Sequence, residues 1–99
     1  MSSQKDKDNW CVYIIEASDG SFYTGITTNL ERRFSEHQSG RNGAKYFNGR
    51  TPVRVLFHEN NHSRSSASKQ EARIKSMTRS QKITFIEAAQ PLRSKSQSV

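Results

Sequence analysis

The sequence lacks long apolar segments and cysteine pairs, and these absences exclude several classes of protein. The longest apolar run among its 99 residues is the six-residue segment Trp10–Ile15, whereas a membrane-spanning helix needs about 20 residues. The first residues also lack the apolar stretch of a secretory signal peptide. The single cysteine, Cys11, cannot form a disulfide within the chain, which fits a reducing compartment. We therefore expect a cytoplasmic protein that does not span a membrane.

Apolar side chains make up only 31% of the sequence, and the two ends account for part of this low share. Polar and charged side chains dominate residues 1–9 and 93–99. Segments of this composition bury too little apolar surface to offset the entropy lost on ordering, so we expect disordered tails at 1–9 and 91–99. One domain, over residues 10–90, is left to form a thin but sufficient core.

Positive charge is the first indication of a partner. The sequence has 16 Lys and Arg residues against 9 Asp and Glu, which gives a net charge of +7. Six basic residues stand against one acidic residue between Arg32 and Arg54, and the same ratio recurs between Arg64 and Lys82. Such stretches suit a polyanion, because each neutralised phosphate releases bound counterions. Nucleic acid is the partner they favour, and a solvated surface that only aids solubility is the alternative.

Apolar periodicity predicts a small α+β domain with the element order ββαβαα. The segment Trp10–Glu16 is β-branched and aromatic and is apolar on both faces, which is typical of a central strand covered on each side. A turn at 18–21 leads to a second strand, Phe22–Ile26, so the first two strands form a hairpin. With the third strand they make a three-stranded antiparallel sheet flanked by helices.

Capping patterns and alternation place the remaining elements. Thr28 and Glu31 form a capping-box pattern that opens the first helix. In the third strand, Val53, Val55 and Phe57 alternate with the intervening residues and are expected on one face. The expected elements are a helix over 29–39 that stops at Gly40, a basic glycine-containing loop over 40–52, a strand over 53–58, a helix over 65–77, and a last helix opened by Thr78 and Gln81 that ends before Pro91.

Four groups of residues resemble the signature of the GIY-YIG nucleases: Val12-Tyr13-Ile14, Tyr23-Thr24-Gly25, the run Asn29–Phe34 with His37, and the glutamate-bearing segment Gln70–Lys75. The resemblance runs from Trp10 to Lys82, and the order of two tyrosines, an arginine and a glutamate is more specific than any single piece. The loop Gly43–Tyr46 and the compact ending look most like the small single-domain branch of this family. The resemblance implies a GIY-YIG-like fold and hydrolysis of phosphodiester bonds.

The resemblance also implies a role for five residues. Tyr13 and Tyr23 would face the scissile phosphate, and Tyr23 would activate or position the attacking water. Arg33, with His37 beside it, would stabilise the charge that develops on the phosphate, a task suited to a planar, permanently charged donor. Glu71 would bind one divalent ion, Mg²⁺ or Mn²⁺, that stabilises the leaving oxygen, because one carboxylate with water and phosphate is a typical way to hold magnesium.

Each of these residues also has an interpretation without catalysis. A tyrosine within a strand more often packs in the core, although Gly25 favours a site near Tyr23, because a glycine inside a strand often marks a close approach. Arg33 and His37 lie one turn apart at the rim of the core-facing side of their helix, where both can be structural. Glu71 lies on the apolar side of its helix, and an ion pair with a basic neighbour would satisfy it equally well.

The two tyrosines can share a site only if the hairpin loop has an odd number of residues, because facing residues on paired strands point the same way. Asp19-Gly20 by itself suggests a two-residue turn, which would place Tyr13 and Tyr23 on opposite faces. We predict instead the three-residue loop Ser18–Gly20, with Gly20 left-handed in a bulge.

Other basic residues are candidates for contacts with nucleic acid: Arg32, Lys45, Arg50 and Lys75. Tyr46 lies among basic residues in the glycine-containing loop and could stack on a base, with local packing as the alternative. The cysteine and histidines show none of the paired ligand spacings of a zinc site, so zinc is not expected.

Two departures from the family pattern keep more than one function open. The glycine usual two residues before the first tyrosine is replaced by Cys11, and no asparagine follows Asn61, where many of these nucleases carry one. The leading hypothesis is a Mg²⁺-dependent endonuclease that cuts DNA, in repair or recombination. A binding module that holds DNA or RNA without cutting it is the alternative, and a domain that meets an acidic protein is a third. A monomer is the starting expectation.

Overall fold

The computed structural model describes residues 9–40 and 43–89, so the expected tails lie outside the described residues except for Asn9. Its elements are β1 (Trp10–Ala17), β2 (Phe22–Thr27), α2 (Leu30–Ser39), a short 3₁₀ helix η1 (Lys45–Phe47), β3 (Pro52–His62), α3 (Arg64–Lys75) and α4 (Arg79–Ala88). The predicted order ββαβαα is therefore confirmed, and η1 is added within the expected loop. None of the described helices is long and apolar enough to cross a membrane.

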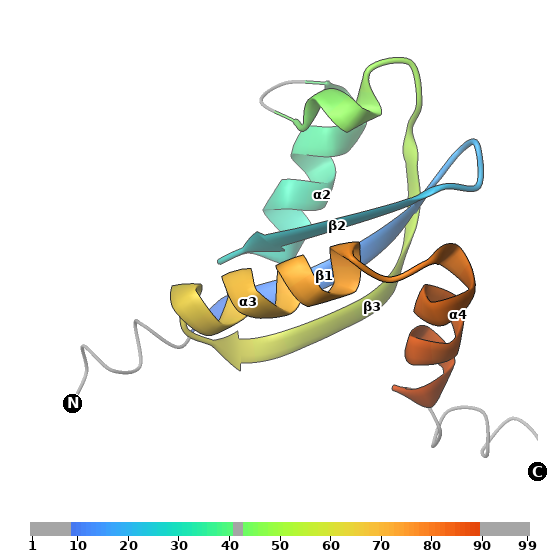
Figure 1. Cartoon of the computed structure of the whole chain (residues 1–99). Helices are drawn as coiled ribbons and strands as arrows, with labels where there is room; N and C mark the ends of the chain where they lie inside the picture. Colours follow the sequence, from blue (N-terminus) through green and yellow to red (C-terminus); the bar gives the residue numbers. More distant parts are fainter. Residues whose placement is uncertain (1–8, 41–42, 90–99) are drawn as a thin grey trace, which may run out of the picture.

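The three strands form one antiparallel sheet in the order β2-β1-β3 (Figure 1). β1 is the central strand, as its continuous apolar sequence predicted, and Val12, Ile14 and Ile15 have no exposed surface. A strand buried on both faces needs cover on both sides. Figure 1 shows that α2 and α3 supply it from opposite faces of the sheet.

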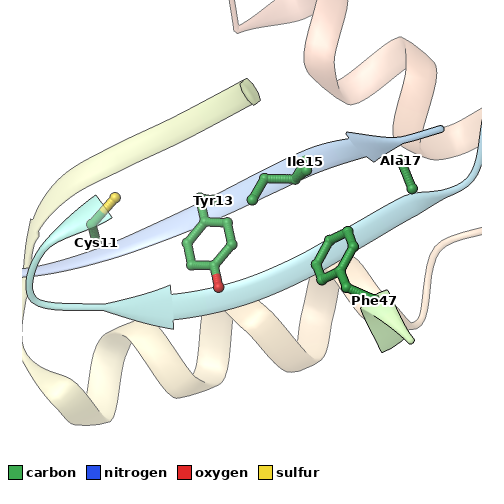
Figure 2. Close-up of a cluster of buried hydrophobic side chains, with 5 residues drawn as sticks. All are labelled: Cys11, Tyr13, Ile15, Ala17 and Phe47. Atoms are coloured by element: carbon green, nitrogen blue, oxygen red, sulfur yellow. The ribbon is translucent and has the colours of Figure 1, made fainter. Parts of the chain in front are cut away.

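The alternation of β1 side chains divides the core into two layers. On the α2 side, Cys11, Tyr13, Ile15 and Ala17 pack with Phe47 of η1 (Figure 2). The second layer consists of Val12 and Ile14 of β1, Phe57 of β3, and Ala67 and Ile74 of α3. The ring of Phe85 joins α4 to this second layer, with its centroid 4.9 Å from that of the Phe57 ring. Both tyrosines of the candidate site, Tyr13 and Tyr23, belong to the layer on the α2 side.

The hairpin loop has three residues, as predicted. The Ala17 N–H donates to the Ser21 carbonyl at 2.8 Å, which closes the loop, and Gly20 has a φ of 85°, where a side chain would be strained. In the resulting register Tyr13 lies opposite Gly25, and Tyr23 lies opposite Ile15. Both tyrosines therefore point to the same face of the sheet.

β3 departs from the simple alternation expected of it. Val55 pairs with Ile15 and Phe57 pairs with Ile14, so two neighbouring β1 residues face β3 residues that are two apart. Leu56 is the extra residue of a bulge, and the bulge turns Val55 and Phe57 to opposite faces. The expectation that Val53, Val55 and Phe57 share one face is wrong, and Val53 itself is 54% exposed.

The helix ends agree with the sequence patterns except at the start of α2. The N-cap of α2 is Asn29 rather than Thr28, because the Asn29 side chain accepts a hydrogen bond from the Arg32 N–H at 3.0 Å. At the other end, Gly40 caps α2 in a left-handed conformation, as expected. The capping box of Thr78 and Gln81 opens α4 as predicted. α3 has a capping box of its own, made by Ser63 and Ser66.

Candidate active site

Tyr13 lies at the centre of the candidate site and is only 1% exposed. Its phenol lies directly over Gly25 on the neighbouring strand. A Cβ atom at position 25 would come within 2.5 Å of the Tyr13 hydroxyl and within 3.1 Å of the Tyr23 ring. The glycine therefore marks a close approach, as its sequence position suggested, and the approaching group is a tyrosine side chain.

His37 projects from α2 against this phenol and is 2% exposed. Its Nε2 atom lies 3.1 Å from the Tyr13 hydroxyl, and its Nδ1 atom accepts a hydrogen bond from the Ala44 N–H at 3.2 Å. Burial, aided by the charge of Arg33, lowers the pKa of His37 to about 4. The imidazole is therefore neutral at physiological pH and lies deeper than the rim position expected from the helix pattern.

The electrostatic setting keeps the Tyr13 phenol protonated. Burial raises the pKa of Tyr13 well above its usual value, and the charges of Tyr23 and Glu71 act in the same direction. A hydrogen bond and the positive charge of Arg33 oppose this increase without cancelling it. Tyr13 is thus suited to donating a hydrogen bond rather than to acting as a base.

Arg33 lies one helical turn before His37, near the Glu36 carboxylate and the Tyr13 phenol. Its Nη1 atom is 3.0 Å from Oε1 of Glu36, and the Tyr13 phenol is close enough to influence the pKa of the guanidinium. Burial lowers the pKa of Arg33, but the Glu36 hydrogen bond and the nearby phenols of Tyr13 and Tyr23 together raise the pKa above its usual value, so the guanidinium stays charged. Its neighbour Arg32 has a side chain that is 63% exposed, so it remains open to contact with nucleic acid.

Tyr23 is half-buried at the meeting point of the aromatic side chains. Its ring centroid lies 6.2 Å from that of Tyr13 and 5.4 Å from that of His37, with an edge-on arrangement to the imidazole. The ring centroids of Tyr46 and Phe47 each lie 5.2 Å from that of Tyr23. Packing on several sides restricts the ring to a narrow range of positions.

Glu71 lies on α3 between Ala67 and Ile74, the two buried residues of that helix, and its side chain is 23% exposed. It forms an ion pair with Lys75, whose Nζ is 3.2 Å from Oε2. It is also close enough to raise the pKa of Tyr13, although α3 covers the other face of the sheet. The ion pair is the partner that the non-catalytic interpretation expected, and the role of Glu71 as a metal ligand stays a prediction.

A divalent ion would have one carboxylate available here. Among residues 9–40 and 43–89, no group of three or more Asp, Glu, His and Cys side chains is placed to hold a metal. A multi-ligand cage is thus absent from the described chain, whereas Mg²⁺ commonly takes one or two carboxylates and fills its other positions with water and phosphate oxygens. Glu71 fits that mode, because its partner Lys75 is 53% exposed and can move away.

Two loop residues predicted to contact nucleic acid are engaged within the fold. Nε of Arg50 lies 2.9 Å from Oδ2 of Asp19, and its guanidinium lies 4.4 Å above the Tyr46 ring. The Tyr46 hydroxyl donates to the Ser21 hydroxyl and lies 3.3 Å from the Phe22 carbonyl. One face of Tyr46 is therefore covered by Arg50, whereas Lys45 and Lys75 are exposed.

Three residues that contribute to the candidate site were not predicted from the sequence. Glu36, which pairs with Arg33, was detectable because it lies three residues further along the same helix. Ala44 acts through its backbone N–H, which leaves no trace in the residue type. Gly43 permits that contact, because a Cβ there would lie 2.9 Å from the Glu36 carbonyl oxygen and 3.0 Å from the His37 Cα.

Comparison with known proteins identifies the family. The model of the GIY-YIG catalytic domain matches residues 9–84. The chain is 42% identical over 87 residues to a UPF0213 protein from Desulfotalea psychrophila, covering 88% of this chain and 79% of that protein. A UPF0213 protein from Halobacterium salinarum is 52% identical over 71 residues, or 72% of this chain and 91% of the relative.

Two solution NMR structures have the same fold. A UPF0213 protein from Bacillus halodurans superposes with a TM-score of 0.52 and 39% identity, covering 80% of this chain and 83% of that one. A protein from E. faecalis gives a TM-score of 0.55 and 41% identity, covering 79% and 82%. The tyrosine, arginine and glutamate positions lie within the matched region, and the chain is a member of the GIY-YIG catalytic domain family.

Proposed function

We propose that the protein is a metal-dependent endonuclease that hydrolyses phosphodiester bonds in DNA. The observation that carries this proposal is the convergence of Tyr13, Tyr23, Arg33 and His37 on one site, with the Glu71 carboxylate close enough to act on the Tyr13 phenol. Membership of the GIY-YIG family supports the reaction class. A phosphate group fits this combination because the site offers a permanent positive charge beside neutral hydrogen-bonding groups.

Each side chain has a role that follows from its chemistry. Arg33 carries a charged guanidinium, so it stabilises the negative charge that builds on the phosphoryl oxygens. The protonated Tyr13 phenol donates a hydrogen bond to the same group. Tyr23 orients the attacking water, whose oxygen bonds to phosphorus as the ester P–O bond breaks. One proton of this water passes to solvent, and the leaving oxygen takes a proton from solvent. His37 holds Tyr13 in place.

Glu71 is the proposed ligand of a single Mg²⁺ or Mn²⁺ ion. The chemistry supplied by a bound ion of this kind is stabilisation of the negative charge on the leaving oxygen. For this chain the requirement is that Lys75 releases the carboxylate when the ion and substrate arrive. Since Lys75 is exposed, it can turn from Glu71 towards a DNA phosphate without leaving a buried charge unpaired.

Contacts to the DNA backbone are assigned to exposed basic residues around the site. Arg32, Lys45 and Lys75 are all exposed, so they can neutralise phosphates, whereas Arg50 and Tyr46 contribute by shaping the loop. Because phosphate contacts carry no sequence information, we expect binding that is weak, strongly salt-dependent and sequence-tolerant. We further propose that the protein acts in DNA repair or recombination, in the cytoplasm and without membrane attachment.

The test is cleavage of supercoiled, branched and single-stranded DNA by purified protein, with Mg²⁺ or with a chelator. We expect cutting that needs the metal and falls by about 100-fold or more in Arg33→Ala, Glu71→Ala and Tyr23→Phe. Arg73→Ala and Glu87→Gln are the matched controls, because both residues are exposed on α3 and α4 away from the aromatic cluster, and both should cut normally.

The same experiment identifies the alternative function. Two observations support a binding module as the alternative: no asparagine follows Asn61, and Glu71 already has an ion-pair partner. Tight DNA or RNA binding without cutting, unchanged by Glu71→Ala, would establish that module and remove the nuclease proposal.

A further inference from the structure

We infer that the main chain at Gly43-Ala44 belongs to the working site, where it fixes the tautomer of His37 and thereby leaves the Tyr13 hydroxyl as a hydrogen-bond donor. The first part of this inference stands on hydrogen-bond geometry alone. The second part, that the donated hydrogen bond serves a bound phosphate, rests on the proposed function.

The backbone N–H of Ala44 decides which imidazole nitrogen carries the proton. This N–H lies 3.2 Å from Nδ1 of His37 and can only donate, so Nδ1 must be the unprotonated nitrogen. The buried imidazole is neutral at physiological pH, which leaves it one proton. That proton is therefore on Nε2.

The tautomer in turn decides the direction of the Tyr13 hydrogen bonds. Nε2 lies 3.1 Å from the Tyr13 hydroxyl and, being protonated, it donates to the phenol oxygen. The Arg33 guanidinium, which has donors only, is close enough for its positive charge to act on the same phenol. With Nε2 donating to its oxygen and the positive charge of Arg33 nearby, the phenol keeps its own hydrogen to donate.

This arrangement excludes the role of a general base for His37. His37 cannot take the proton of Tyr13, because the nitrogen that faces the phenol already carries one. His37 is therefore a positioning residue that acts through Tyr13, and Ala44 is a positioning residue that acts through His37.

The loop is built so that Ala44 can reach the imidazole. Gly43 approaches α2 so closely that a Cβ would lie 2.9 Å from the Glu36 carbonyl oxygen. Phe47 then anchors the following turn: its N–H donates to the Ala44 carbonyl at 3.0 Å, and its ring centroid lies 4.6 Å from that of His37. A loop without these contacts would leave Nδ1 facing solvent or a different donor.

The backbone conformation of Ala44 permits a direct test. Its φ of −68° matches the value that proline requires, so Ala44→Pro keeps the backbone angle and removes the N–H donor, while the proline Cδ that replaces the hydrogen displaces the imidazole from the loop. Gly43, the residue before it, tolerates a following proline because it has no Cβ. Ala44→Val adds a similar volume and keeps the N–H, so it serves as the matched control.

Histidine tautomers are read from long-range proton–nitrogen correlation spectra of ¹⁵N-labelled protein at neutral pH. For wild type and Ala44→Val we expect His37 with an unprotonated Nδ1 and a protonated Nε2. For Ala44→Pro we expect the Nδ1-protonated form to appear, with amide spectra otherwise close to wild type. A wild-type His37 protonated on Nδ1, or an unchanged tautomer in Ala44→Pro, would overturn the inference.

Cleavage measurements test the second part. Ala44→Pro should cut DNA about tenfold to 100-fold more slowly than Ala44→Val, with equal DNA affinity, because a misdirected hydrogen bond weakens stabilisation of the transition state. Equal cleavage by the two variants would refute the role of Tyr13 as a hydrogen-bond donor to the phosphate. If wild type does not cut at all, the proposed function fails, whereas the tautomer spectra still decide the first part independently.

Discussion

The buried imidazole of His37 predicts that the protein loses stability in mild acid. The pKa of this histidine falls from 6.5 to about 4 because burial disfavours its charged form. In the unfolded chain the same side chain binds a proton near pH 6.5. Unfolding therefore takes up a proton between these two values, and the free energy of unfolding decreases as the pH falls through this window.

The size of the effect follows from the two pKa values. A difference of this size corresponds to about 3 kcal/mol once the pH is below both values, and to about 2 kcal/mol by pH 5. For a small domain with a total stability of about 5 to 15 kcal/mol, a loss of this size is readily measured. Above about pH 7.5 the contribution of His37 to the pH dependence is negligible, because neither state is protonated.

Urea unfolding followed by the fluorescence of Trp10, the single tryptophan, measures this dependence between about pH 8 and pH 5. His37→Gln is the comparison variant, because its amide can still donate to the Tyr13 hydroxyl but does not titrate. The carboxylates titrate in both proteins, so the difference between the two pH profiles isolates His37. Parallel profiles for wild type and His37→Gln would refute the argument, because they would mean that His37 titrates alike in the folded and unfolded chains.

Three further predictions concern single positions. Gly25→Ala places a Cβ 2.5 Å from the buried Tyr13 hydroxyl, so we expect a loss of about 1–3 kcal/mol in urea unfolding and loss of cleavage; wild-type stability would contradict the close packing. The buried hydroxyl of Thr24 has no hydrogen-bond partner among the residues that the structure describes. Thr24→Val should therefore raise the free energy of unfolding by about 1 kcal/mol, and a decrease would indicate a hidden partner. Lys75→Met removes the cation 3.2 Å from Glu71, a largely exposed pair worth under about 1 kcal/mol. Mn²⁺ titration should then show binding two- to fivefold tighter, and unchanged affinity would count against Glu71 as the ligand.

The sequence predicts this fold well wherever a local pattern has one structural outcome. The apolar run of β1 could only be a strand covered on both faces, and the capping box at Thr78 could only open a helix. The hairpin needed an additional argument, because Asp19-Gly20 is compatible with two loop lengths. The requirement that both tyrosines share one face selected the three-residue loop, which the register confirms.

Elsewhere the outcome depends on partners that a local pattern does not contain. The alternation of β3 predicted a regular strand, but its register follows β1, and the bulge at Leu56 moves Val55 and Phe57 to different layers of the core. At the start of α2, Thr28 and Asn29 are both acceptable caps, and only the contact with the Arg32 N–H distinguishes them. The backbone donor of Ala44 could not be predicted at all, because every residue except proline has one.

From the sequence, each site residue was assigned either a packing role or a catalytic role. The geometry shows that the same residue can have both roles. Tyr13 and His37 are among the most buried side chains of the described chain, so they satisfy the packing interpretation. Yet burial is what keeps the imidazole neutral and the phenol protonated, and close packing is what holds their hydrogen bonds in a fixed direction. A group that must stabilise charge in a transition state works best when it is already oriented and cannot relax towards solvent. A buried tyrosine beside a charged arginine is therefore a stronger indication of a phosphate site than either an exposed tyrosine or an exposed arginine would be.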